Sequence, residues 1–235
     1  MLDNLPLILS SLAAGVPPTV FAAVGGIALT IALSAVAGLA LLSRHRAVRA
    51  VSRVYVEFFR GTSEVVQLFW IFFVLPALVG YQIVPLAAGI VVLGLNHGAY
   101  GAEIVRGAVR SVPRAQYDAC TALSLSPWDR MRRVVLPQAV VEMLPSFTNL
   151  FIQLLKSTAL LSLVVVDEIV RRGQLLVPNL GVGEKLTIYL VELLLYLGLA
   201  VLVTSGMRLL ERRAAARVGR PPTAARSGFA TGVAM

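Results

Sequence analysis

The chain has 235 residues, of which 57% are hydrophobic and 14% charged, and its mean hydropathy is +0.82. A soluble domain carries about 25% charged residues, so this composition excludes a soluble domain. It predicts an all-α integral membrane protein with about five transmembrane helices. The net charge of +9 comes from arginines that lie between apolar segments without basic aromatic patches, which argues against nucleic-acid binding.

The amino-terminal segment predicts an outer-face lead followed by the first span. Residues 1–15 contain no Lys or Arg, so the positive start of a cleavable signal peptide is absent, and we expect residues 1–18 to form an extracytoplasmic or interfacial lead. Residues 19–42 are uncharged and long enough to cross a hydrocarbon layer of roughly 30 Å. The arginines of residues 44–60 then place the inner end of this span in the cytoplasm.

A second uncharged stretch covers residues 65–102 and is too long for one helix. At about 1.5 Å per residue it would measure nearly twice the thickness of a membrane, so we expect two spans, over residues 62–79 and 84–106. The inner end of the first of these holds Glu64 and Gln67. Three turn-favouring residues mark the outer connection: Pro76, Gly80 and Pro85.

Residues 105–138 form the longest charged interval and read as a cytoplasmic loop, the coupling loop. Residues 115–123 predict a short helix. A second helix has a start signal in which a hydroxyl caps free amides, a proline fits the first turn and an acid favours the positive helix end: Ser126, Pro127 and Asp129. We expect this helix to end near Leu136, before Pro137.

The rest of the chain predicts two more spans, over residues 144–166 and 186–209, joined by an amphipathic outer segment, 167–185. Lys and Arg number 5 in residues 44–60, 6 in the coupling loop and 6 from Arg208 onward, against 3 in the outer segment. This bias predicts an outside amino terminus and an inside carboxyl terminus. Residues 19–209 therefore form the transmembrane domain, and residues 210–235 read as a disordered cytoplasmic tail.

The coupling loop resembles that of the membrane subunits of bacterial ABC importers. Their pattern runs Glu, Ala, Ala, three residues, Gly, nine residues, Ile, one residue, Leu, Pro. The equivalent positions here keep the spacing: Asp118, Ala119, Cys120, Ser124, Val134, Leu136 and Pro137. The flanks RGAVRSVPRAQ, VVLPQA, LPSFTNLFIQLLKSTAL and VEFFRGTSEVVQLF are similar to the polar amino-acid (histidine and glutamine permease) branch, and the resemblance covers roughly residues 20–205.

This resemblance implies a type I ABC importer permease of the bacterial cytoplasmic (inner) membrane. An ATPase dimer that carries ATP and Mg²⁺ would grip the coupling loop, a second permease of the same or a different kind would complete the core, and an extracytoplasmic binding protein would deliver the substrate. The implied substrate is a polar amino acid or related zwitterion. FRGTSEVVQLFWIFFVLP and SPWDRMRRVVLPQ also resemble permeases for ectoine-type compatible solutes.

Three departures from the family pattern bear on the docking contact and the turn. Asp118 is one methylene shorter than Glu, and Cys120 replaces Ala. Ser124 stands in place of a glycine, which can take a left-handed turn cheaply; if the turn is left-handed, a non-glycine residue costs about 1 kcal/mol or more. The departures leave the docking role in place and suggest that the second permease is a different chain with the fuller pattern.

Two polar stripes lie inside the predicted spans, each with the i, i+4, i+7 spacing of one helix face. They are Asn96, Tyr100 and Glu103, and Asn149, Gln153 and Lys156. Such stripes face protein or a water-filled path rather than lipid. Two interpretations stay open: the stripes line the substrate path, or they join helices, with the ionisable members in structural ion pairs.

Other polar and small residues in the spans have packing interpretations. We expect His97 to be a hydrogen-bonded packing residue. Gly94 and Gly98 form a small-xxx-small pair that admits a close helix. Glu192 is placed to pair with Arg171 or Lys185.

The sequence indicates a transport subunit rather than an enzyme. No phosphate-binding G-x-x-x-x-G-K-[ST] loop, Cys/His cluster or catalytic motif occurs, and the single cysteine excludes an internal disulfide. ATP hydrolysis therefore belongs to a partner chain. The alternatives are an ion-coupled carrier or channel that acts without an ATPase, or a membrane scaffold, and neither explains the coupling loop.

Overall fold

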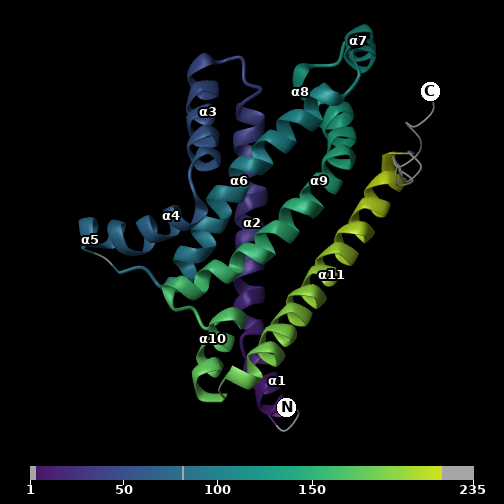
Figure 1. The fold of residues 1–235 in the computed structure, drawn as a ribbon. Coiled ribbons are helices and arrows are strands. Elements are labelled where there is room, and N and C mark those ends of the chain that lie inside the picture. Colours follow the sequence, from purple (N-terminus) through teal and green to yellow (C-terminus); the bar gives the residue numbers. More distant parts are fainter. Residues whose placement is uncertain (1–3, 81, 181, 219–235) are drawn as a thin grey trace, which may run out of the picture.

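A computed structural model describes residues 4–80, 82–180 and 182–218, and these are helical almost throughout, with no strand among them (Figure 1). The elements in chain order are α1 (Leu5–Ala13), α2 (Val16–Ala40), α3 (Arg46–Gly61), α4 (Glu64–Phe69), the π-helical turn η1 (Trp70–Val74), α5 (Leu75–Val79), α6 (Pro85–Ser111), α7 (Arg114–Ala122), α8 (Pro127–Asp129), the π-helical turn η2 (Arg130–Val135), α9 (Leu136–Ser157), the 3₁₀ helix η3 (Thr158–Val164), α10 (Ile169–Leu180), the 3₁₀ helix η4 (Val182–Glu184) and α11 (Lys185–Val218).

Three helical stretches of the described chain are long and apolar enough to cross a membrane: Leu5–Ala40, Pro127–Val164 and Lys185–Ala216. A fourth candidate is the bent pair Arg46–Gly61 and Glu64–Val79. The 27-residue helix α6 is long enough, but its polar residues, Asn96 and His97 among them, lower its hydropathy. The described chain thus has three candidate spans, or four with the bent pair, and α6 would be the fifth of the sequence-based count.

The predicted second span differs from a straight crossing. Helix α3 ends at Gly61 and the chain turns by 105° before Glu64, so that α4 and α5 run sideways from the bundle in Figure 1. At about 1.5 Å per residue, Glu64–Val79 measures roughly 24 Å, which is short of a hydrocarbon layer of roughly 30 Å. The outer turn follows as predicted, with Gly80 left-handed at φ 73° and Pro85 in the first turn of α6.

The centre of the bundle is the close packing of α2 against α6. A Cβ atom added to Gly94 would clash with Leu29 of α2, and one added to Gly98 would lie 2.8 Å from Leu33. The interpretation of these two glycines as packing residues is therefore confirmed. Helix α9 packs against α6 through a buried cluster that includes Phe147 and Phe151. Helix α11 packs against α9, but most of the surface of α11 is exposed.

The prediction that a helix ends near Leu136 is wrong. Residues Pro127–Val164 form one continuous helical stretch that passes through Pro137. The π-helical turn η2 directly precedes Leu136 and Pro137, and a wider turn accommodates a proline that lacks an N–H and would crowd the carbonyl four residues earlier. The same arrangement recurs where η1 precedes Leu75 and Pro76.

The carboxyl-terminal boundary also differs from the expectation. The tail was expected to begin at residue 210, but α11 continues as a helix to Val218. The sequence of this extension, ERRAAARV, is rich in alanine and arginine, which have the highest helix propensities. The remainder of the predicted tail, residues 219–235, lies outside the described residues.

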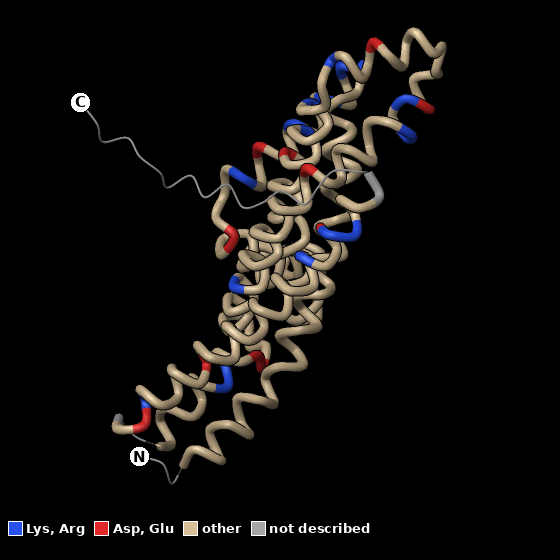
Figure 2. Tube along the Cα trace, turned by 90° about the vertical axis from the view of Figure 1, so that its right-hand side faces the viewer, with Lys and Arg blue, Asp and Glu red and all other residues tan. Residues whose placement is uncertain are grey.

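Charged residues are unevenly distributed along the molecule. Figure 2 shows most of the Lys and Arg residues in the half that carries α7 and α8, whereas α1 and α10 lie at the opposite end (Figure 1). This half contains the arginines of α3, of the coupling loop and of the end of α11. The arrangement matches the predicted topology, in which that end faces the cytoplasm.

The coupling loop folds into the expected elbow of two helices. Helix α7 is followed by Ser124, which has a left-handed backbone at φ 53°. The side chain of Ser126 then caps the next helix, since its Oγ accepts a hydrogen bond from the backbone N–H of Asp129 at 3.1 Å. The predicted serine cap is confirmed, and the turn at Ser124 is left-handed, so the steric cost expected for such a turn applies here.

Replacing Ser124 by glycine is expected to stabilise the elbow, because glycine adopts a left-handed backbone without the steric cost of a Cβ atom. We expect Ser124→Gly to raise the free energy of unfolding by about 1 kcal/mol, measured by thermal unfolding of the purified protein. The matched control is Ser126→Gly, which removes the cap and is expected to lower stability by a few tenths of a kcal/mol. A destabilised Ser124→Gly protein would contradict the left-handed turn.

Candidate functional site

A polar groove opens on the bundle where α3 ends and α6 and α9 cross. It encloses about 430 Å³. Its polar lining comes from three helices: Arg60, Tyr100, Glu103, Ser146, Asn149 and Gln153. The structure thus brings together two residues of each predicted stripe and adds an arginine from α3.

Opposite charges line this groove without neutralising each other directly. The guanidinium carbon of Arg60 lies 5.1 Å from the centre of the Tyr100 ring, a cation–π arrangement. Glu103 instead pairs with Arg106, one turn further along α6. A cationic group and a carboxylate therefore lie along one groove with exposed amides between them, which suits a ligand that carries both charges.

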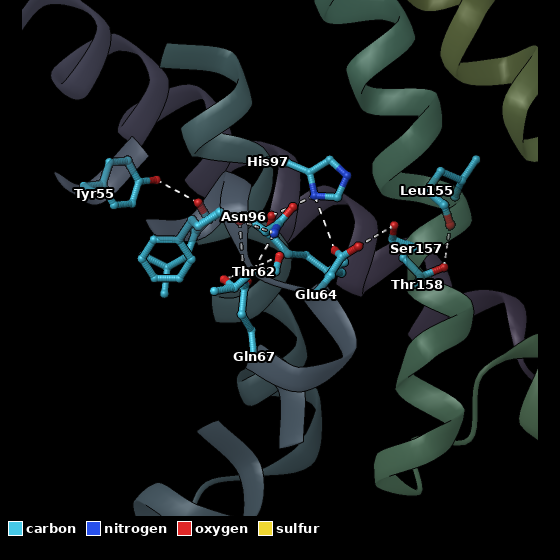
Figure 3. A network of polar contacts seen from close by, with 12 residues as sticks. Tyr55, Thr62, Glu64, Gln67, Asn96, His97, Leu155, Ser157 and Thr158 are labelled. Carbon is cyan, nitrogen blue, oxygen red and sulfur yellow. Dashed lines mark hydrogen bonds and ion pairs between the residues drawn. The ribbon is translucent and has the colours of Figure 1, made fainter. Parts of the chain in front are cut away.

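Asn96 is the one residue of the first stripe that lies outside the groove. It stabilises the break between α3 and α4 (Figure 3). Because α3 ends at Gly61, the carbonyl of Phe59 lacks its intrahelical donor. Asn96 Nδ2 donates to this carbonyl at 3.0 Å and to Gln67 Oε1 at 3.2 Å. Gln67 Nε2 donates to the same carbonyl at 3.0 Å and to Thr62 Oγ1 at 2.7 Å.

A second buried cluster continues this network toward α9 (Figure 3). The carboxylate of Glu64 lies 3.5 Å from His97 Nδ1 and accepts a hydrogen bond from Ser157 Oγ at 2.9 Å. His97 is 1% exposed, and its Nδ1 lies 3.1 Å from the Leu93 carbonyl. Since a carbonyl only accepts, Nδ1 carries the proton. His97 is thus a hydrogen-bonded packing residue as expected, but sequence reasoning missed its proximity to Glu64.

Lys156, the last member of the second stripe, lies in a separate cleft between α9, α10 and α11. Glu192 of α11 lines the same cleft. The expected pairing of Glu192 with Arg171 or Lys185 is absent: neither cation lies within 4.0 Å of its carboxylate among the described ion pairs. Both residues line the cleft, and neither has an ion-pair partner among the described residues.

The coupling-loop residues named by the family pattern divide between surface and core. Asp118, Ala119, Ser124 and Pro137 are exposed, Leu136 is partly buried, and Cys120 is the buried residue of α7, at 3% exposure. Two large apolar side chains missed by the sequence reasoning, Leu123 and Trp128, also extend into solvent, at 73% and 70% exposure. An exposed apolar surface of this kind, flanked by arginines, is typical of a site for another protein.

Comparison with known proteins identifies the class of this chain. Residues 30–216 match the family described as "binding-protein-dependent transport system inner membrane component". The chain is 44% identical over 179 residues to the "probable amino-acid ABC transporter permease protein y4tF" of Sinorhizobium fredii, covering 74% of each protein. It is 36% identical over 200 residues to the "glutamine transport system permease protein GlnP" of Escherichia coli, covering 85% of this chain and 90% of that one.

A solved structure shares the fold. The crystal structure of an amino acid ABC transporter with histidines aligns with a TM-score of 0.72 and 28% identity, and covers 91% of this chain and 96% of the other. Inward-facing structures of the MetNI methionine ABC transporter align with a TM-score of 0.69 at 19% identity. The arrangement of helices is therefore that of an ABC importer membrane subunit.

Asn96 is expected to act through stability rather than through the groove. Asn96→Leu leaves Gln67 Oε1 buried without its donor, so the free energy of unfolding should fall by about 1–3 kcal/mol. Asn149→Leu, on the exposed groove face, should change it by less than about 0.5 kcal/mol. Thermal unfolding of both purified variants distinguishes the two positions, and an equal loss for both would contradict the buried role of Asn96.

Proposed function

We propose a substrate and a path for this chain, which belongs to the family of binding-protein-dependent transport system inner membrane components and is a permease subunit of an amino-acid ABC importer. The proposed substrate is a zwitterionic amino acid. Its proposed path is the groove lined by Arg60, Tyr100, Glu103, Asn149 and Gln153. The observation that carries the proposal is that a cation, Arg60, and a carboxylate, Glu103, line one groove. Such groups are costly in hydrocarbon and mark substrate pathways.

The charge arrangement supports a zwitterionic substrate. Arg60 supplies a planar donor group for a carboxylate, and Glu103 with the exposed amides of Asn149 and Gln153 supplies acceptors for an ammonium. The relatives named above are described as permeases for amino acids or glutamine, which favours an amino acid over an ectoine-type solute. We therefore propose an amino acid as the first candidate and ectoine as the second arm of the uptake test.

Transport of this kind requires partner chains. The sequence contains no phosphate-binding loop, so we propose that a separate ATPase dimer binds ATP and Mg²⁺ and that an extracytoplasmic binding protein supplies the substrate. We propose a second permease subunit, of the same or a different chain, and a location in the bacterial cytoplasmic membrane. Family membership does not support the alternative of an ion-coupled carrier or channel that acts without an ATPase.

The elbow is the proposed contact with the ATPase. Asp118 and Ala119 lie exposed on α7, and Leu123 adds an apolar side chain at its end. Cys120 is only 3% exposed, so we assign it to the packing of α7 rather than to the contact with a partner. The continuous helix from Pro127 to Val164 joins this contact to the groove, which supports transmission of ATPase closure as a rigid-body movement.

Coupling is tested by Ala119→Arg in the complete transporter, reconstituted in vesicles. A bulky charge on the docking face should abolish ATP-driven uptake and binding-protein-stimulated ATPase activity, while the permease remains inserted. The control is Ala47→Arg, at an exposed position of α3 away from the elbow, which should keep wild-type uptake. Normal uptake by Ala119→Arg would remove the elbow from the coupling mechanism.

The groove is tested by Glu103→Gln, which removes its carboxylate charge but keeps its shape. We expect amino-acid uptake to fall by about tenfold or more with the complex still assembled, because one charge-assisted contact contributes roughly that factor. Glu57→Gln, an exposed acid on α3, serves as the control and should leave uptake unchanged. If Glu103→Gln prevents assembly without a specific effect on uptake, Glu103 has the structural role instead.

A further inference from the structure

The cleft that contains Lys156 is separate from the groove and has a different composition. It encloses about 580 Å³ between the end of α9, η3, α10 and α11. This volume lies within the range of about 300–1,000 Å³ that small-molecule sites occupy. Its walls are mainly apolar, with two tyrosines, Tyr189 and Tyr196, and two groups of opposite charge, Lys156 and Glu192.

Lys156 has no ion-pair partner within the described part of the chain. No carboxylate oxygen of those residues lies within 4.0 Å of its ammonium. Its neighbour Ser157 hydrogen-bonds to Glu64 on the other side of α9, so Glu64 does not serve Lys156. An ammonium in this position within a span is costly unless an anion reaches it.

Glu192 is the complementary group, and it too lacks a partner among the described residues. It is 8% exposed, and its Oε1 packs against Gly173 of α10 without a hydrogen bond. The neighbouring acid Glu168 is fully satisfied in contrast, since it accepts hydrogen bonds from the backbone N–H groups of Val170 and Arg171 and from Tyr196 Oη. These two backbone amides and Tyr196 Oη thus serve Glu168, and Glu192 Oε1 remains without a hydrogen-bond donor among the described residues.

We propose that this cleft is a second binding site for a zwitterionic solute, in which Lys156 binds the carboxylate and Glu192 binds the ammonium, with Tyr189 and the apolar wall covering the rest of the molecule. The inference rests on the proposed function and extends it. Gln153 of the groove and Lys156 of the cleft are three residues apart on α9, so the two sites adjoin on one helix. Because Lys156 is closer to the outer end, a solute from outside meets the cleft first.

A zwitterionic lipid headgroup presents the same pair of charges, so the experiment must separate lipid from solute. We choose the solute, because the cleft adjoins a groove that carries the same two kinds of charge. Complexes reconstituted in nanodiscs of phosphatidylglycerol alone contain no zwitterionic lipid. Addition of phosphatidylethanolamine then tests the other source directly.

Uptake by the wild type first selects the probe among radiolabelled glutamine, histidine, cystine and ectoine. The test is then equilibrium binding of that probe to the complete transporter without ATP. We expect two bound molecules per copy of this chain. Lys156→Met and Glu192→Gln should each weaken one of the two sites by about tenfold or more, since each removes one charge-assisted contact. Lys156→Arg keeps the charge and should retain that site within about threefold. Lys185→Met, outside the cleft, is the matched control.

The outcomes distinguish a second solute site, a lipid site and a failure of the proposed function. If Lys156→Met and Glu192→Gln both bind like the wild type while Glu103→Gln lowers uptake, the inference is wrong and the proposed function stands. If phosphatidylethanolamine displaces the probe from the wild type, and Lys156→Met removes this competition, the cleft is a lipid site and the inference is wrong. If the wild-type transporter takes up none of the four probes, the proposed function fails together with the inference.

Discussion

Satisfaction of backbone polar groups inside the membrane is the constraint on which this structure depends. A helix that breaks in hydrocarbon leaves carbonyls without donors, and water is not available to replace them. At the break after Gly61, the amides of Gln67 and Asn96 supply these donors from α4 and α6. The break in turn ends α3 with Arg60 beside Tyr100, so the cation of the groove is positioned by the same hydrogen bonds that make the bend possible.

Features with local causes could be predicted from the sequence. The uncharged run of α2, the turn at Gly80 and the cap at Ser126 each follow from residues that are neighbours in the chain. The 3.6-residue period also identified the two stripes that supply Tyr100, Glu103, Asn149 and Gln153 to the groove. These assignments required no knowledge of how the helices cross.

Features that depend on helix crossing could not be predicted in this way. The spacing of the first stripe grouped Asn96 with Tyr100, but the 105° bend turns the α3–α4 junction against Asn96 and withdraws it from the groove. Glu192 was assigned a partner on the outer segment, whereas α10 uses its own backbone amides on Glu168. The helix that passes Pro137 was missed because sequence rules for proline assume an α-helical turn, and η2 is a π-helical one.

The continuous helical stretch Pro127–Val164 has a mechanical consequence. Its 38 residues correspond to a rod of roughly 57 Å. One end of this rod lies at the elbow, and Lys156 lies near the other, so no flexible connection intervenes between them. A rod that pivots where α9 crosses α6 moves its two ends in opposite directions. A swing of the elbow toward the bundle axis would therefore move Lys156 away from that axis, so that the cleft would open at one end of the rod as the bundle closes at the other.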